Sequence, residues 1–181
     1  MADLPPEAAL AEAIALYNAG RQADAQALCD ALLAQRGPHP AVDQLAAVLR
    51  QERGDAAGAR RHIERSLAAR PGHVPSLMIA ALAYQDLREL GAAEAALQQV
   101  LRQQPGHVAA AVNLGIVQLE QGRLADAMRC FGQAFVARPE TFGRIAHALA
   151  TPSTGALWLD LDTLRAALRA AAAQAPSPLR R

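Results

Sequence analysis

The chain has 181 residues, of which 52% are apolar, 3% aromatic and 19% charged, so it can bury a core. Its 18 basic residues, all arginine, nearly balance 17 acidic ones, which excludes a general electrostatic attraction to nucleic acid or to an anionic membrane. Alanine supplies much of the apolar content, and because alanine is the best helix former we expect an all-helical fold.

The amino terminus, MADLPPEAAL, has no basic n-region and carries early acids, so we expect no signal peptide. No apolar run approaches the roughly 20 residues that a membrane span needs, so no membrane insertion is expected. Together these features favour a cytoplasmic location. Cys29 and Cys130 fall among apolar neighbours and are expected to be free, buried thiols; a nucleophilic cysteine–histidine pair is the alternative.

A fixed period runs along the chain. It is carried by four alanines, three prolines and three histidines: Ala25, Ala59, Ala93, Ala127, Pro71, Pro105, Pro139, His39, His73 and His107. A constant interval of about 34 residues indicates one supersecondary unit repeated along the chain. We expect each unit to consist of two helices.

Apolar residues spaced i, i+3, i+4, i+7 predict the buried stripe of each first helix. In the first three units these stripes are Leu10-Ala13-Ile14-Tyr17, Val42-Leu45-Ala46-Leu49 and Leu77-Ala80-Ala81-Tyr84. In this register the stripes begin at Leu10, Val42, Leu77 and Ala111 and are unevenly spaced, whereas the second helices keep one interval throughout. We expect the turns to absorb the difference.

The end of each first helix is predicted at Gly20, Gly54 and Gly122, because glycine readily adopts the left-handed conformation of a helix C-terminus; Arg88 stands in that place in the third unit. The second helices present Ala25/Cys29/Leu33, Ala59/Ile63/Leu67, Ala93/Leu97/Leu101 and Ala127/Phe131/Phe135.

This pattern resembles the tetratricopeptide repeat, whose consensus is Trp-x2-Leu-Gly-x2-Tyr, then Ala-x3-Phe, then Pro. The matching residues are Leu114-Gly115, Tyr17, Tyr84, Ala127-x3-Phe131 and the periodic prolines. The resemblance implies an all-α, tetratricopeptide-type α-solenoid, a right-handed superhelix of helix-turn-helix repeats with a C-terminal capping helix. Residues 1–141 would hold four repeats, at about 7–39, 40–73, 74–107 and 108–141.

Residues 142–175 are expected to form a partial fifth repeat, with a first helix over 142–150, followed by the capping helix. Asp160 or Asp162 would open that helix, and Leu161, Leu164 and Leu168 would form its apolar face. Thr151 to Gly155 would act as a hinge, Trp158 would report on docking, and 176–181 would be a flexible tail. Exchange of this helix between two copies would give a homodimer.

In the family that the chain resembles, the first helices line a concave groove, so candidate partner-binding residues are taken from them. They are Asn18, Asp43, Gln44, Arg50, Met78, Ile79, Leu82, Gln85, Val112, Asn113, Ile116, Leu119 and Glu120. The apolar end of this groove is either covered by the chain's own C-terminal helix or open to a partner's helix or extended peptide. Since the chain contains no lysine, a lysine-based clamp for a peptide carboxylate is not expected.

No catalytic motif is present, and we expect no enzyme activity, no cofactor and no metal. His39, His73 and His107 lie one repeat apart, too far for a shared ion, and are expected to begin helices as polar residues. Arg60, Arg61 and Arg65 form a basic run without the interleaved aromatics that nucleic-acid stacking needs, so they are expected on a solvated face.

The sequence therefore favours a non-enzymatic scaffold or adaptor that binds a protein or peptide partner in the groove, with a chaperone-like role as a narrower version. The alternative is a regulatory or substrate-recruiting module for a separately encoded enzyme. Self-association through the C-terminal helix is a third possibility.

Overall fold

The computed structural model describes residues 6–150 and 160–174, and all regular structure in them is helical. The predicted all-α fold class is confirmed. The helices are α1 Pro6–Asn18, α2 Gln22–Arg36, α3 Pro40–Glu52, α4 Ala56–Ala69, α5 Val74–Asp86, α6 Leu90–Gln103, α7 Val108–Glu120, α8 Leu124–Ala137, the 3-10 helix η1 Pro139–Thr141, α9 Phe142–Leu149 and α10 Leu161–Ala173.

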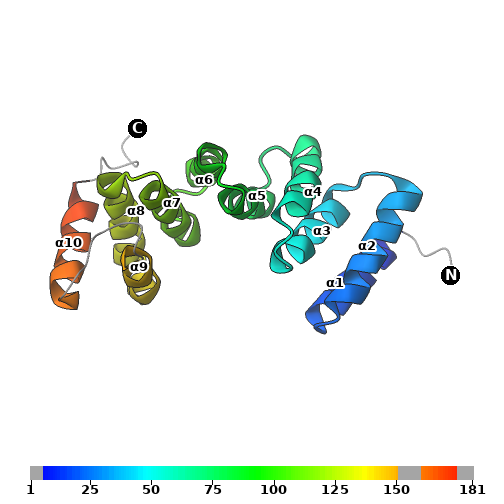
Figure 1. Cartoon of the computed structure of the whole chain (residues 1–181), viewed down its shortest axis with the longest axis horizontal. Helices are drawn as coiled ribbons and strands as arrows, with labels where there is room; N and C mark the ends of the chain where they lie inside the picture. The colour runs from blue at the N-terminus through cyan, green and yellow to red at the C-terminus, as the bar shows by residue number, and fades with distance from the viewer. Residues whose placement is uncertain (1–5, 151–159, 175–181) are drawn as a thin grey trace. The chain divides into compact units, whose positions relative to one another are not determined.

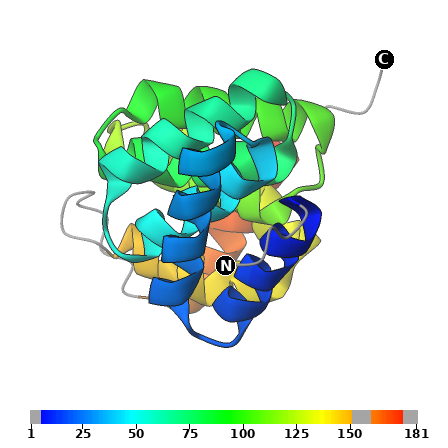
Figure 2. The ribbon, with the colours of Figure 1, turned by 90° about the vertical axis from the view of Figure 1, so that its right-hand side faces the viewer.

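The chain divides into two compact units, Met1–Arg88 and Glu89–Arg181. Unit 1 contains α1 to α5, and unit 2 contains α6 to α10 (Figure 1). In unit 1 each second helix packs against the first helix of its own pair and against the next first helix. Thus α2 contacts both α1 and α3, and α4 contacts both α3 and α5. Figure 2 shows α1 and α2 joined by their short turn.

The first helices begin at Pro6, Pro40, Val74 and Val108, and each has 13 residues, so they repeat at the same interval as the second helices. The predicted uneven spacing of the stripes is therefore wrong. The true register is marked by a fully or almost fully buried small residue in every first helix, at Ala13, Ala47, Ala81 and Gly115. The misassigned stripe of α1 included Ile14, which is 43% exposed.

The predicted turns after the first helices are correct. Gly20, Gly54 and Gly122 have φ of 74°, 76° and 77°, in the left-handed region where a Cβ is costly. Arg88 takes this conformation in the third turn, with φ of 60°, as its place in the period predicted.

The core of unit 1 lies between its paired helices. One cluster of buried residues joins α1, α2 and α3, and it includes Ala13, Cys29, Val42 and Leu49. A second cluster joins α3, α4 and α5 through Ala47, Ile63 and Ala80. The first helices of this unit are thereby held side by side, with α3 in contact with both α1 and α5.

The core of unit 2 joins α7, α8, α9 and α10, and contains Phe131, Phe135, Ile145, Leu164 and Leu168. A Cβ on Gly115 would lie 2.4 Å from the Phe131 ring, so the glycine makes room for the largest side chain at this helix crossing. Leu114 and Phe131, predicted on the buried faces of the best-formed repeat, are both buried.

The last two helices of unit 2 depart from the pattern of the preceding pairs. Elsewhere a second helix packs on the helix that follows it, but α8 packs closely on α10, while α9 contacts η1 and α7 (Figure 1). As predicted, Asp160 opens α10, accepting from the backbone N–H groups of Asp162 and Thr163. Leu164 and Leu168 are buried, but Leu161, expected beside them, is 51% exposed. The hinge Thr151–Gly155, Trp158 and the tail 176–181 lie outside the described residues.

Candidate functional site

The constant repeat interval brings equivalent side chains of α1, α3 and α5 into rows on one face of unit 1. Ile14, Val48 and Leu82 form the apolar row; Ile14 is 43% exposed, Leu82 is 38% exposed and Val48 is half-buried. Large apolar side chains that remain this accessible on adjacent helices provide a surface for contact with another molecule.

One turn beyond the apolar row, hydrogen bonds join neighbouring first helices. Tyr17 Oη donates to Glu52 Oε1 at 2.5 Å, and Gln51 Nε2 donates to the carboxylate of Asp86. Gln22 Nε2 also donates to Glu52, at 2.7 Å. The hydrogen bond to Glu52, then burial and the Glu52 charge, raise the pKa of Tyr17, so the phenol stays protonated and keeps donating. Glu52 and Asp86, the carboxylate pair, are both exposed.

Several predicted groove residues lie on the first helices of unit 1 and remain accessible. Asn18 and Leu82 are exposed, and Gln44, Met78 and Gln85 are half-buried. Gln44 accepts a hydrogen bond from Arg70 at 3.4 Å. Ile79 is also half-buried, but it packs against the cluster of Ala47, Ile63 and Ala80.

Asp43 does not lie in a groove, contrary to the prediction. It is 1% exposed, and its carboxylate accepts from the backbone N–H of His39 at 3.2 Å and from Arg65 at 2.5 Å. His62 Nδ1 lies 2.9 Å from Asp43 Oδ1, the oxygen that Arg65 also binds. The error follows from the misassigned register of α3, because that register assigned to the groove residues whose side chains pack on α4.

Arg50 was misplaced for the same reason. Its guanidinium is engaged by acids of the neighbouring segments, Asp55 at 2.9 Å and Asp30 at 3.5 Å. Asp55 opens α4 by accepting from the backbone N–H of Gly58, and this bond, followed by the one from Arg50, holds the pKa of Asp55 below its usual value. Arg50 therefore stabilises the turn between α3 and α4.

In unit 2 the predicted groove residues of α7 are largely covered by the chain itself. Val112, Asn113 and Leu119 are buried, while Ile116 and Glu120 are half-buried. Arg144 of α9 donates to Asn113 Oδ1 at 2.5 Å. Val112 and Leu119 belong to the same core cluster as Ile145 and Leu149 of α9. The C-terminal helix is not the element that covers these residues, because α10 packs on α8; the helix that packs on α7 is α9.

Sequence reasoning missed most of the face that unit 1 presents. Ile14 and Tyr17 had been assigned to a buried stripe, and Val48, Gln51 and Glu52 had not been considered. The signal that could have found them was present, because successive repeat intervals counted back from Ile116 lead to Leu82, Val48 and Ile14.

The periodic histidines begin the first helices, as predicted. His39 and His107 accept hydrogen bonds from the backbone N–H groups of Val42 at 3.4 Å and Ala110 at 3.1 Å. His73 differs, since its Nδ1 lies 2.9 Å from Ser76 Oγ, and burial, followed by the nearby Arg70 charge, lowers its pKa. Among the described residues, no three histidine, cysteine, aspartate or glutamate side chains are grouped so as to hold a metal ion.

Both cysteines are free. Cys29 is fully buried in the core of unit 1, and Cys130 is half-buried and donates through Sγ to Gln118 at 3.3 Å. Burial is the largest influence on each thiol and raises the pKa of both to about 11. A catalytic thiol needs a lowered pKa and an electropositive, accessible setting, so this geometry does not suit a nucleophile.

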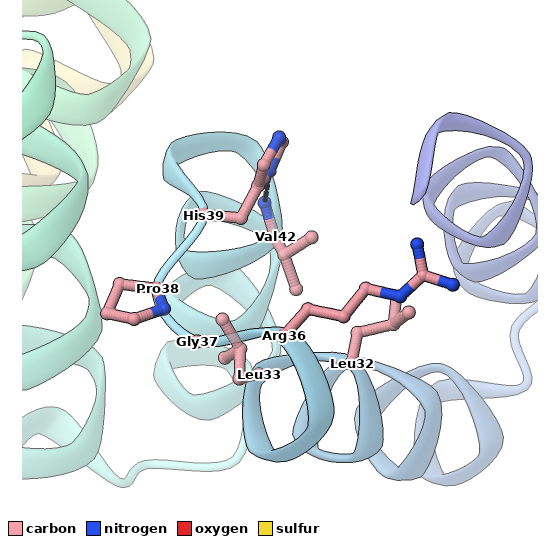
Figure 3. Close-up of a pocket in the computed structure, with 7 residues that line it drawn as sticks. All are labelled: Leu32, Leu33, Arg36, Gly37, Pro38, His39 and Val42. Atoms are coloured by element: carbon pink, nitrogen blue, oxygen red, sulfur yellow. Dashed lines mark hydrogen bonds between the residues drawn. The ribbon is translucent and has the colours of Figure 1, made fainter. Parts of the chain in front are cut away.

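A cavity of about 200 Å³ lies where α2 ends and α3 begins (Figure 3). Leu32, Leu33 and Val42 supply apolar walls, and Arg36 and His39 add polar groups. Pockets that enclose cofactors or drug-sized ligands measure about 300–1,000 Å³, so this cavity suits at most one side chain of a partner.

The basic run on α4 is engaged within unit 1. Arg60 pairs with Glu64 at 2.8 Å and lies 6.0 Å from the centre of the Tyr84 ring. Arg65 is bound to Asp43, as described above. These contacts give two of the three arginines an intramolecular role.

Stacked helix pairs of constant length define an α-solenoid. The sequence model described as Tetratricopeptide repeat matches residues 86–151, and the helix pairs of the chain have the tetratricopeptide-type fold. Proteins of this fold are generally interaction scaffolds that bind protein partners. No curated protein matches the chain in sequence.

Three solved structures illustrate the fold. MamA residues 41 to the end from Desulfovibrio magneticus RS-1 is 20% identical, with 75% of this chain and 77% of that chain aligned and a TM-score of 0.70. TTC0263, a thermophilic tetratricopeptide repeat protein of Thermus thermophilus, is 22% identical over 97% and 94%, with a TM-score of 0.68. A tetratricopeptide repeat protein from Parabacteroides merdae ATCC 43184 is 18% identical over 95% and 63%, with a TM-score of 0.72.

Across the described residues, each helix is too short or too polar to cross a membrane.

Proposed function

We propose that the protein is a non-enzymatic scaffold or adaptor, with a chaperone-like role, that binds a peptide or helix of a partner protein on the first helices of unit 1. The observation that carries this proposal is the face formed by α1, α3 and α5, where Ile14 and Leu82 are exposed. The other exposed large apolar side chains of the described residues, Leu124, Val136 and Leu161, all lie in unit 2. On this face Tyr17 and Gln51 bridge adjacent helices, which fixes the surface in advance of binding and lowers the entropic cost of association.

The chemistry of the chain supports a binding role over catalysis. The thiols have raised pKa values, the helix-opening histidines bind within their own helix ends, and the cavity at α2 and α3 is small. None of these groups is poised to act on a substrate.

A cytoplasmic location is part of the proposal. Cys29 and Cys130 are both free, which is the usual state of thiols in a reducing compartment.

Site-specific photo-crosslinking in the native cell tests the binding face. Val48 is replaced by p-benzoyl-phenylalanine to report on the first helices of unit 1, and Ala68, exposed on α4 of the same unit, is replaced as the matched control. We expect a discrete crosslinked protein from position 48 and none from position 68.

Crosslinking from position 68 alone would place the binding surface on the second helices and contradict the proposal. The identity of the crosslinked protein separates an adaptor from the alternative role, because a module that recruits substrates for an enzyme would capture that enzyme or its substrate.

A further inference from the structure

We propose that the first-helix face of unit 1 binds an amphipathic helix of a partner protein that carries arginine or lysine beside its apolar side chains. This inference rests on the proposed function and names the chemistry of the partner. It is argued from the apolar row, Ile14, Val48 and Leu82, and from the carboxylate pair, Glu52 and Asp86.

The spacing of the apolar row suits a helix that crosses α1, α3 and α5. Packed helices lie about 8–10 Å apart, so successive members of the row are separated by about that distance. Along a partner helix, residues i and i+7 are about 10 Å apart on the same face. Apolar side chains at this spacing can therefore contact successive members of the row, and the exposed Ile14 and Leu82 gain the most from being covered.

The carboxylate pair gives the same face its charge. Glu52 and Asp86 each follow a member of the apolar row by four residues, so they lie one helical turn further along the same side. Glu52 accepts from a phenol and an amide, and Asp86 accepts from an amide, so these bonds orient both carboxylates without neutralising them. The nearest cations in sequence, Arg53 and Arg88, belong to the turns that follow the helices. The carboxylate pair is therefore complementary in charge to a basic residue of a partner.

Unit 2 contains an internal example of this kind of contact. On α9, Ile145 and Leu149 are four residues apart and share a buried cluster with Val112 and Leu119 of α7. Next to them, Arg144 donates to Asn113 of α7 at 2.5 Å. The first helix α7 thus already binds another helix of the chain, through paired apolar side chains and an arginine. In unit 1, the carboxylates of Glu52 and Asp86 could bind an arginine or lysine of a partner helix in the same way.

The test uses the full chain and two fluorescent helical peptides in a polarisation titration. Both peptides carry leucines at i, i+7 and i+14; one has arginines beside them and the other has glutamates at the same positions. We expect the basic peptide to bind at least tenfold more tightly than the acidic one. The double variant Glu52→Gln/Asp86→Asn should reduce this preference to less than threefold, and Leu82→Ser should weaken the basic peptide at least tenfold.

The matched control is Asp24→Asn/Glu64→Gln, which removes two carboxylates of unit 1 that lie on α2 and α4, and it should leave binding of the basic peptide within twofold. Equal binding of both peptides, a preference for the acidic one, absence of binding, or binding that survives Leu82→Ser overturns the inference. If position 48 still crosslinks a protein in cells, such a result rejects the partner chemistry alone; loss of both signals rejects the proposed function as well.

Discussion

At the scale of single residues, the two helices of a pair have residues of complementary size where they cross. The first helices place Ala13, Ala47 or Gly115 at the crossing, and the second helices place Cys29, Ile63 or Phe131 in the same buried clusters or in direct contact. The largest of these side chains faces the only glycine among the three. Because interiors are close-packed, the fourth pair requires its glycine while the others accept alanine.

We expect Gly115→Ala to lower the free energy of unfolding by roughly 1–3 kcal/mol, since the added methyl overlaps the Phe131 ring and overpacking costs that much. Phe131→Leu alone should also destabilise the protein. The double variant Gly115→Ala/Phe131→Leu should lose less unfolding free energy than the sum of the two single losses. Urea titration measures all three. Gly91→Ala is the control, because a Cβ there meets no atom within 4 Å; additive effects at 115 and 131 would contradict the size match.

Asp43 should matter for stability and not for binding. We expect Asp43→Asn to cost roughly 1–3 kcal/mol, because it weakens a buried network in which Arg65 and the His39 backbone N–H both donate to the carboxylate. Asp24→Asn, at an exposed site on α2, should change stability by less than about 0.5 kcal/mol. Chemical denaturation provides the comparison, and a cost as small as that of the control would show that Asp43 is not held in this network.

The two thiols should make stability fall in alkaline solution. Burial raises the pKa of Cys29 and Cys130 from 9.0 to about 11, so the unfolded chain releases these protons at lower pH than the folded chain. Their contribution is therefore complete below pH 9 and is lost as pH rises to about 11. The variant Cys29→Ala/Cys130→Ala should show a shallower decline over this window than the parent chain; parallel declines would mean that the thiols are not buried as described.

At the scale of helices, α8 and α10 of unit 2 approach each other closely. A Cβ on Gly132 would lie 2.4 Å from the backbone oxygen of Leu168 and 2.8 Å from the backbone nitrogen of Ala172. Around this contact, the Arg165 guanidinium lies 4.2 Å from the centre of the Phe142 ring, and that of Arg169 lies 5.5 Å from Phe135. Cation–π contacts of this kind add to the burial of Leu164 and Leu168.

Gly132→Ala should loosen α10, because a backbone atom cannot move aside as a flexible side chain can. We expect a loss of roughly 1–3 kcal/mol in unfolding free energy and faster hydrogen exchange in α10. Gly143→Ala on α9 has open space and should be neutral or stabilising by up to about 1 kcal/mol. Unchanged exchange in α10 after Gly132→Ala would mean that the two helices do not approach this closely.

The positions of the helices could be predicted from the sequence, but which side of each helix is buried could not be predicted equally well. The period, the turn glycines and the N-terminal histidines depend on local backbone requirements, so they located both helices of every pair. The stripe of α1 was misassigned because Leu10, Ala13, Ile14 and Tyr17 fit helical spacing as well as the true set with Ala9 and Ala13. In an alanine-rich helix, several faces are apolar enough to satisfy that pattern.

The packing of α9 and α10 could not be predicted from sequence periodicity, for a different reason. Both helices have apolar faces, and which of them packs on α8 depends on Gly132, whose missing side chain admits the α10 backbone. Likewise, the burial of Val112 and Leu119 depends on contacts with residues that lie far along the chain, in α9. Such tertiary contacts leave no periodic signal in the sequence.

At the scale of the whole molecule, each compact unit has its own core and its own thiol. Cys29 lies in the cluster of α1, α2 and α3, and Cys130 lies on α8, the helix that α10 covers. The reaction of each thiol with a colourless disulfide reagent therefore reports the opening of one unit. In a repeat protein, contacts pass between neighbours, so a defect at one end is strongest in the helices nearest to it.

Removal of residues 151–181 should expose the face of α8 that α10 now covers, with Phe135 among the uncovered side chains. We expect increased binding of a hydrophobic dye, a lower unfolding midpoint, and much faster modification of Cys130, while Cys29 keeps its protection because its cluster contains no residue of α10. Mass spectrometry of the modified chain gives both rates in one experiment, and the full-length chain is the control. Equal acceleration at both thiols would show that the units open together, and unchanged rates at both would show that α10 contributes nothing to the stability of unit 2.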